Sequence, residues 1–231
     1  MGSEKKSWKN FFPLIFFILM GSINAEGKKP EAFIAPQEKK DVFAEGLAEL
    51  EKVNNSIKLH ADSTELYLNR LRLTYVLGVK EKKYLEQSEK DLGWLQNRKE
   101  MKNAKALLLA YEGAIQVAHA KHGFNFPKKW EHLKRGLPLL DSAISISPKE
   151  PEPRYLRLVS NYYLPFFLGG KPKVKEDFAA LAQTLPGVTQ MFPPKWYVSI
   201  AKFVVEKGNL AQDETKNLEV CILTVSQGIA E

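Results

Sequence analysis

Two helix-like runs separated by three prolines constrain the fold of this chain more than any other feature. In residues 128–147, large side chains recur at intervals of three and four, which aligns them on one face of a helix. These side chains are Trp130, Leu133, Leu137, Leu140 and Ile144, and residues 155–166 repeat the spacing with Tyr155, Leu158, Val159, Tyr162 and Phe166. Pro148, Pro151 and Pro153 lack backbone donors and bias the preceding residues away from the helical conformation. The chain from Lys128 to Gly170 is therefore predicted to be an antiparallel helix pair.

The small and large residues of the first run resemble the second helix of a tetratricopeptide repeat. The positions that carry the resemblance are Gly136, Leu140, Ala143 and the closing Pro148. In such a helix the small residues let a neighbour approach, the large residue fills the gap and the proline ends the helix. The second run is similar to the first helix of the following repeat, displaced by one residue. Because the family's period of about 34 residues is not sustained along the chain, the resemblance implies a degenerate, tetratricopeptide-like array.

Four short patterns in the same region are similar to uncharacterised bacterial envelope proteins. They are Lys121-His122, Pro127-Lys128-Lys129, Leu140-Asp141-x-Ala143 and Glu152-x-Arg154-x-x-Arg157. This similarity implies an envelope location and brings no known activity with it.

The periodicity of three and four predicts helices along most of the remaining chain. Further helices are expected at residues 39–59, 65–79, 81–98, 102–121, 174–185, 195–207 and 213–227. No strict two-residue alternation persists, so strands are not expected. The predicted fold is all-α, with about eight or nine helices packed as antiparallel pairs in a degenerate tetratricopeptide-like solenoid. The alanine-rich helix at 102–121 contains Gly113, which indicates a close helix crossing, and we expect this helix to be the central and most buried one.

The first 25 residues are typical of a secretory signal peptide. Lys5, Lys6 and Lys9 form a positive region, residues 11–20 are apolar, and Ala25 offers a small residue for cleavage. The apolar run is shorter than the roughly 20 residues of a membrane span, so a retained anchor is the less favoured alternative. Residues 26–37 are polar and are expected to form a flexible leader, followed by a single helical domain at 38–231. The predicted location is the periplasm or the extracellular space.

The charge balance is basic. The full chain carries 34 Lys and Arg against 27 Asp and Glu, and residues 1–25 hold three lysines and one glutamate, so the chain from Glu26 has a net charge of +5. Export separates the chain from nucleic acid, and its lysines are scattered. A solvated surface is the simpler explanation, and weak contact with an anionic membrane surface or cell-wall polymer is the alternative. The lone Cys221 lies on an apolar stripe and is expected to be inert packing.

Three histidines lie close together in sequence and raise the question of a metal site. His119 and His122 are three residues apart, and His132 follows in the next helix. Three histidines can ligate zinc. However, the chain has no H-E-x-x-H pattern and no cysteine nearby, so a solvated helix end is favoured and no metal or other cofactor is predicted.

The candidate binding residues lie at the start of the second run and beside it. Guanidinium groups grip planar anions and stack on aromatic rings, so two arginines among tyrosines could hold a carboxylate or an anionic sugar. The candidate set is Arg154, Arg157, Tyr155, Tyr162, Tyr163 and Trp130. In the alternative, the arginines pair with Asp141 or Glu131 and only stabilise the fold. The aromatic cluster of Tyr162, Tyr163, Phe166 and Phe167 is likewise either core or the wall of a groove, and core is favoured.

The chain shows no nucleophile elbow, no phosphate-binding glycine loop and no convergent carboxylate pair, so an enzyme is not predicted. The leading hypothesis is a non-enzymatic binding or scaffold protein of the bacterial cell envelope that recognises a peptide or partner protein on a concave helical surface. The alternative is a soluble exported receptor for a small anionic or aromatic ligand held among the central helices. A cell-wall-acting enzyme is the third hypothesis and would need clustered carboxylates in a cleft. An open groove would favour the first hypothesis, and an enclosed aromatic cavity with an inward arginine would favour the second.

Overall fold

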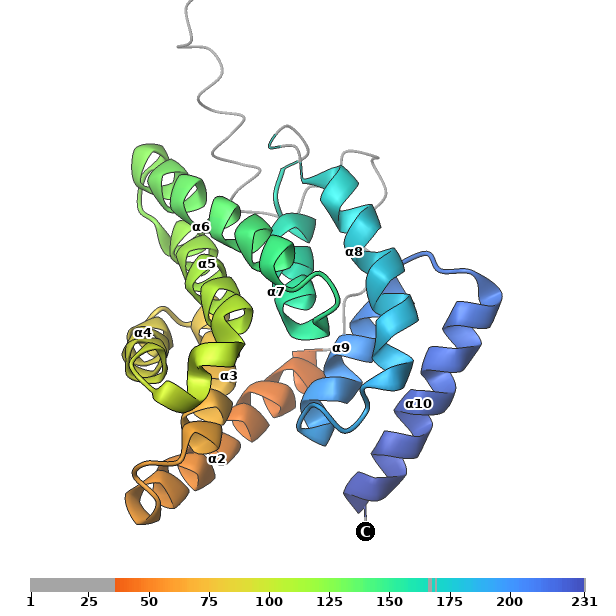
Figure 1. The fold of residues 1–231 in the computed structure, drawn as a ribbon, viewed down its shortest axis with the longest axis horizontal. Coiled ribbons are helices and arrows are strands. Elements are labelled where there is room, and N and C mark those ends of the chain that lie inside the picture. The colour runs from red at the N-terminus through yellow and green to blue at the C-terminus, as the bar shows by residue number, and fades with distance from the viewer. Residues whose placement is uncertain (1–35, 166–167, 169, 231) are drawn as a thin grey trace, which may run out of the picture.

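The regular structure of the chain is helical throughout the part that the computed structural model describes, residues 36–165, 168 and 170–230 (Figure 1). This part contains nine α-helices and two short 3₁₀ helices, and no strand. The α-helices are α2 (Pro36–Leu59), α3 (Thr64–Lys80), α4 (Lys83–Gln96), α5 (Lys105–His122), α6 (Phe126–Ile146), α7 (Pro151–Tyr162), α8 (Lys171–Thr184), α9 (Pro194–Lys207) and α10 (Gln212–Ala230), and the 3₁₀ helices are η2 (Lys99–Ala104) and η4 (Leu185–Gly187). The predicted all-α fold is confirmed. The predicted signal peptide, most of the leader, Phe166 and Phe167 lie outside the described residues. The first two residues of α2, Pro36 and Gln37, fall within the predicted leader.

Local chemistry explains where several helices begin. Ser63 precedes α3, and its Oγ accepts a hydrogen bond from the Leu66 N–H at 3.3 Å. Asn125 does the same for α6, where its Oδ1 accepts from the Lys128 N–H at 3.1 Å. Both side chains satisfy an amide that has no partner in the first helical turn. Pro151 lies in the first turn of α7, where the missing N–H removes no helical hydrogen bond.

Consecutive helices pack in pairs, but α6 packs mainly on α5 and not on its predicted partner α7. The most extensive contacts join α3 with α4, α5 with α6, α7 with α8, and α9 with α10, while α2 lies along α3 (Figure 1). The predicted contact between α6 and α7 across Pro148 exists, yet the main partner of α6 is α5. The predicted α6–α7 pair is therefore a contact of the fold but not the most extensive contact of either helix.

Two glycines explain why α5 and α6 pack so closely. A Cβ placed on Gly113 would lie 2.7 Å from the carbonyl oxygen of Gly136, and a Cβ on Gly136 would lie 2.6 Å from the carbonyl oxygen of Gly113. Leu140 is fully buried next to Gly113. Each glycine thus makes room for the backbone of the other helix, and the close crossing that Gly113 indicated is confirmed.

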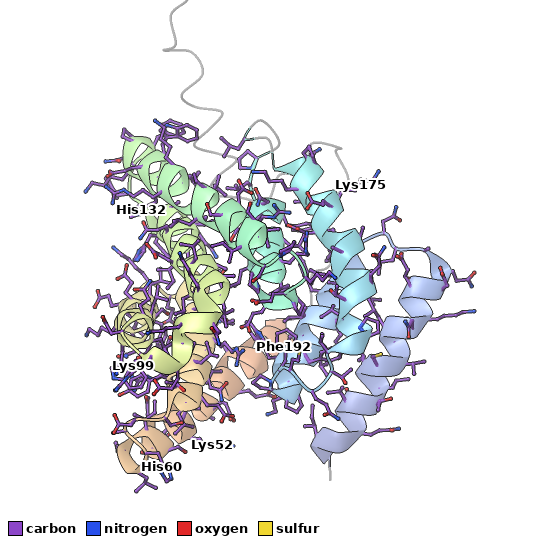
Figure 2. The ribbon with its side chains drawn as sticks, in the orientation of Figure 1. Lys52, His60, Lys99, His132, Lys175 and Phe192 are labelled. Carbon is purple, nitrogen blue, oxygen red and sulfur yellow. The ribbon has the colours of Figure 1, made fainter. Side chains whose placement is uncertain are left out.

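The buried apolar side chains form two clusters. The first core draws on α3, α4, α5 and α6 and on Leu156 of α7. The second core draws on Leu158 of α7 and on α8, η4, α9 and α10, and it includes Phe192, which is labelled in Figure 2. Nine of the 12 residues of α7 are buried, compared with nine of the 18 residues of α5. The prediction that the alanine-rich helix would be the most buried is therefore wrong, because α7 lies between the two cores and is covered on both sides.

Candidate binding groove

The two arginines of the predicted binding set are ion-paired within the fold. Arg157 donates to both carboxylate oxygens of Asp177, from Nε at 3.0 Å and from Nη2 at 2.7 Å. Arg154 donates from Nη1 to the same carboxylate at 2.9 Å. Both arginines are about 6% exposed, and Asp177 is completely buried. Glu176, the neighbour of Asp177 on α8, also accepts hydrogen bonds from both arginines, at 3.1 and 3.0 Å.

Of the two predicted partners of these arginines, Asp141 contacts Arg157 and Glu131 contacts neither arginine, while the main partner is a residue that was not predicted. Arg157 reaches Asp141 only at 3.4 Å, and Glu131 pairs with Arg135 on its own helix at 2.6 Å. The main partner, Asp177, was not singled out because it lies on the following helix. Burial raises the pKa of Asp177, and the hydrogen bonds from both arginines oppose this rise. Burial alone would also raise the pKa of Glu176, but hydrogen bonds from Arg154 and then the charge of Arg157 lower it.

The aromatic residues of the predicted set do not form one site with the arginines. Tyr155 and Tyr162 pack edge-on against Phe203 in the second core, with ring centroids 6.1 and 5.4 Å apart. Tyr163 is exposed and contacts Tyr162. Trp130 stacks against Phe126 near the start of α6.

The geometry of α6 shows that Trp130 is far from the arginines. Trp130 lies 11 residues before Asp141 on this helix. At a rise of about 1.5 Å per residue, the separation along the helix axis is about 16 Å. Because Asp141 is the α6 residue that Arg157 contacts, Trp130 is remote from the arginine cluster.

A different set of polar residues surrounds a hollow between α4 and α5, which we call the α4–α5 groove. Its cavity volume is about 200 Å³, and its lining residues are Glu89, Leu92, Gly93 and Gln96 of α4 with Glu112, Ile115 and Gln116 of α5. Gly93 has no side chain to fill this space, and no atom lies within 4 Å of the position that its Cβ would occupy. Leu92 and Ile115 belong to the first core and form the apolar floor. The carboxylates and amides form the rim.

Hydrogen bonds fix the rim of the groove. Gln96 Nε2 donates to Glu112 Oε2 at 3.2 Å. His119 Nε2 lies 2.9 Å from Glu89 Oε1, and the carboxylate requires this nitrogen to be the donor. The side chain of Glu89 remains 46% exposed, so this carboxylate is still accessible to solvent. The groove therefore presents two oriented carboxylates to solvent.

The predicted histidine cluster lies beside this rim. His132, labelled in Figure 2, approaches Gln116 with its Nδ1 2.9 Å from Oε1, and its ring stacks on His119 with centroids 5.4 Å apart. Burial lowers the pKa of His132, and repulsion from His119 lowers it further. His122 points elsewhere, with Nε2 2.7 Å from the Gly78 carbonyl oxygen. Within the described residues, no three or more His, Cys, Asp or Glu side chains come together as a metal site.

Sequence reasoning did not single out Glu89 or Glu112. A usable signal was present on α5, where Glu112, Gln116 and His119 follow one another at intervals of four and three. This spacing places the three polar side chains on one face of a helix that is otherwise rich in alanine. The α4 side of the groove, Glu89, Gly93 and Gln96, has the same spacing.

A second hollow lies where the α6–α7 connection meets the segment after α8. Its volume is about 340 Å³, and its lining residues are Ser147, Pro148, Lys149, Glu150, Pro151, Val188 and Met191. Met191 is largely exposed there. This hollow has a mainly apolar lining and lacks the paired carboxylates of the α4–α5 groove.

Comparison of the chain with family models, with curated proteins and with solved structures finds no match. The resemblance to tetratricopeptide repeats therefore stays a prediction. Among the helices of the described residues, none combines the length and the apolar composition that a membrane crossing requires.

Proposed function

We propose that this protein is a non-enzymatic binding or scaffold protein of the bacterial cell envelope, and that its α4–α5 groove binds a basic segment of a peptide or partner protein. The observation that carries the proposal is the open groove itself, which has Glu89 and Glu112 on its rim and an apolar floor. An open groove suits an extended chain better than a small molecule, which is usually held in an enclosed site. The envelope location rests on the signal-like pattern of residues 1–25.

The groove offers complementary chemistry to a lysine or arginine side chain. The carboxylates of Glu89 and Glu112 attract the charged head, and a hydrogen bond to a charged group contributes about 1.5–3 kcal/mol. Leu92 and Ile115 offer an apolar surface to the aliphatic stem. The Gln96 and Gln116 side chains carry both donors and acceptors, which is what an extended peptide backbone needs.

The receptor hypothesis receives less support from the arginines that motivated it. Arg154 and Arg157 are already hydrogen-bonded to Asp177. An incoming anion would have to compete with this buried carboxylate. A ligand held among the central helices would therefore disrupt an existing ion pair before gaining a new one.

Defined peptides test the proposal directly. Fluorescence anisotropy is measured for a labelled lysine–alanine peptide, the same peptide with acetylated lysines, and a glutamate–alanine peptide. We expect only the cationic peptide to bind, and to bind more weakly at high salt because screening reduces the attraction. The protein has a net charge of +7, so binding of a cationic peptide requires a local acidic site and cannot come from overall charge.

Variants assign the binding to the groove. Glu89→Gln combined with Glu112→Gln should weaken binding by about tenfold or more, which corresponds to about 1.4 kcal/mol. Glu206→Gln combined with Glu219→Gln removes two exposed carboxylates from α9 and α10 and serves as the matched control. Equal binding by the groove variant, or no binding of the cationic peptide, contradicts the proposal. Hydrolysis of cell-wall material by the purified chain, lost in the groove variant, would replace it with the enzyme hypothesis.

A further inference from the structure

Three aromatic side chains are exposed around the start of α6. Phe124, in the loop before the helix, is 93% exposed, and Phe126 and Trp130 are 39% and 38% exposed. Phe126 and Trp130 are one helical turn apart, and their rings are nearly parallel, with centroids 6.5 Å apart. Large apolar side chains that gather on a surface in this way are typical of interaction sites.

Lysines accompany these rings. From Lys121 to Arg135 the chain has five Lys and Arg residues and one acidic residue, Glu131. Lys128 and Lys134 are exposed, and neither forms an ion pair with a described residue. The Lys134 ammonium lies 5.6 Å from the centroid of the Trp130 ring. We call Phe124, Phe126, Lys128, Trp130 and Lys134 the aromatic–lysine patch.

The other basic residues of this segment already have roles in the fold. Lys121 Nζ donates to the Val79 carbonyl oxygen at 2.8 Å. Lys129 is buried. Arg135 pairs with Glu131 at 2.6 Å. The exposed lysines of the patch are therefore the ones whose ammonium groups are available to a partner.

The patch and the α4–α5 groove lie on different sides of α6. His132 faces α5 and hydrogen-bonds Gln116 at the groove. Trp130 is two residues earlier, which is about 200° around the helix axis. Occupation of the patch therefore leaves the groove accessible.

We infer that the aromatic–lysine patch docks the protein onto an anionic lipid surface. Tryptophan and phenylalanine rings partition to the level of the lipid headgroups, and adjacent lysines pair with their phosphates. The sign of the charge in the patch is complementary to such a surface. A bilayer also adapts to a protruding ring such as Phe124, whereas a protein partner would need a pocket built to receive it. This inference does not depend on the proposed peptide binding.

Co-sedimentation with lipid vesicles tests the inference. The chain from Glu26, the predicted mature form, keeps every described residue and lacks the apolar run at residues 11–20, which would bind lipid by itself. Vesicles of phosphatidylcholine are compared with vesicles of phosphatidylcholine and phosphatidylglycerol in equal parts. We expect binding to the anionic vesicles, weakened by added salt, and little binding to the neutral ones.

Two variants separate the charges from the rings. Lys128→Gln with Lys134→Gln should weaken binding to anionic vesicles by about 30-fold, since each lysine near such a surface contributes about fivefold. Phe124→Ser with Trp130→Ser should weaken it by about tenfold or more, because the rings no longer enter the interface. Circular dichroism of each variant confirms that the helices are retained.

Matched controls use exposed residues of the other end of the molecule. Lys202→Gln with Lys216→Gln removes the same charge from α9 and α10, and Val220→Ser with Leu223→Ser removes exposed apolar side chains from α10. Both controls should bind like the unchanged protein. The inference is overturned if the controls lose as much binding as the patch variants, if neutral vesicles bind equally well, or if neither vesicle binds.

Discussion

The two cores of this protein are stabilised in different ways. The first core contains a buried ion pair, in which Arg72 of α3 donates to both oxygens of Glu152 of α7 at 2.8 and 2.6 Å. Tyr111 of α5 donates to the same carboxylate at 2.6 Å. The second core has more packed rings, including Tyr155, Tyr162, Phe178, Phe192, Tyr197 and Phe203. Its side of α7 also carries a buried ion pair, in which Arg154 and Arg157 share the carboxylate of Asp177. Each side thus combines packed apolar side chains with a buried ion pair, and the two ion pairs differ in composition, because Glu152 meets one arginine and Asp177 meets two.

Some of the other buried polar groups near the two cores are hydrogen-bonded, and others are not. In the first core, Ser88 Oγ donates to Thr74 Oγ1 at 3.0 Å, and the Thr74 hydroxyl hydrogen-bonds the Arg70 carbonyl oxygen at 2.8 Å. In the second core, Trp196 Nε1 is buried without a hydrogen-bond partner among the described residues. An unpaired buried donor costs about 1–3 kcal/mol. Ser160 Oγ of α7 is also buried without a hydrogen-bond partner among the described residues, so this imperfection is not confined to the second core.

Helix α7 lies between the two cores and carries charged side chains to both. We call the helices around the first core, with the side of α7 that faces them, the first region, and those around the second core the second region. Glu152 and Leu156 are four residues apart on α7 and face the first core. Arg154, Arg157 and Leu158 belong to the other side, where both arginines meet Asp177. Glu152 is paired with one cation, whereas Asp177 is paired with two. The comparison predicts that the first region is more sensitive to the loss of a single charged side chain.

The largest effect is expected for Glu152→Ala. Among the described residues, Arg72 would then be a buried cation with the Asn69 side chain as its one remaining hydrogen-bond partner, and Tyr111 would lose its acceptor. Breaking a buried ion pair from one side typically costs about 3–5 kcal/mol. Urea denaturation should show this loss in the free energy of unfolding.

A combined variant serves as the control. Arg72→Met, Glu152→Leu and Tyr111→Phe together replace the whole polar group by apolar side chains, which is often neutral. This variant should recover most of the lost stability. If it is no more stable than Glu152→Ala, the loss comes from packing around α7 and not from the uncompensated charge.

A smaller loss is expected for Arg154→Ala in the second region. Asp177 keeps the two hydrogen bonds from Arg157, so no buried charge is left unpaired. The loss should be about 1–3 kcal/mol, the cost of removing one charged hydrogen-bonding partner. Urea denaturation under the same conditions makes the comparison. A loss equal to that of Glu152→Ala would remove the distinction between one and two compensating cations.

The crossing of α5 and α6 offers a third comparison, within the first region. Gly113→Ala places a Cβ 2.7 Å from the Gly136 carbonyl oxygen, which forces the two helices apart. Overpacking of this kind costs about 1–3 kcal/mol. Gly93→Ala on α4 is the control, since its Cβ meets no atom within 4 Å. Alanine favours the helix by up to about 1 kcal/mol over glycine, so the control should raise the melting temperature and Gly113→Ala should lower it. Two variants that shift it equally would contradict the close approach.

The positions of the helices could be predicted from the sequence because the signals that set them are local. The apolar spacing marks each helix, and a polar cap such as Ser63 or a proline such as Pro151 marks where it begins. The sequence also indicated a close crossing at Gly113 and a small residue at Gly136. It did not show that these two glycines face each other, because the local pattern does not specify which neighbour a helix packs against.

The partners of the candidate binding residues could not be predicted for the same reason, because they lie on other helices. Arg154 and Arg157 were recognisable as unusual, but their partner Asp177 lies about 20 residues further on and in another helix. Arg72 and Glu152 are 80 residues apart in sequence. The α4–α5 groove similarly depends on two helices. The spacing marks a polar face on each helix, but it does not show that the two faces meet. Contacts between distant residues decide whether a charged side chain belongs to a site or to the fold.

The smallest expected effect is the response of the first region to mild acid. The pKa of His132 is lowered from its ordinary value of 6.5 because burial, and then repulsion from His119, disfavours the charged ring. The unfolded chain therefore takes up a proton at a higher pH than the folded chain does, and stability falls as the pH drops through this range. Among the other charged groups near His132, Glu131 opposes this shift, whereas Arg135 and Lys82 reinforce it. The ion pairs of Glu176 in the second region do not add to the loss, because the pKa of Glu176 is lowered from 4.5 and its contribution persists to more acidic pH.

Melting temperatures at about pH 7.5 and about pH 5 check this response, since the ordinary histidine pKa lies between them. The unchanged protein should melt at a lower temperature at the acidic pH. His132→Gln replaces the ring by an amide that can still donate to Gln116 and takes up no proton, so its loss on acidification should be smaller. If acidification lowers the melting temperature of His132→Gln as much as that of the unchanged protein, protonation of His132 does not cause the acid sensitivity. In that case the acid sensitivity belongs to groups outside the stacked histidine pair, and the first region is not distinguished from the second by this titration.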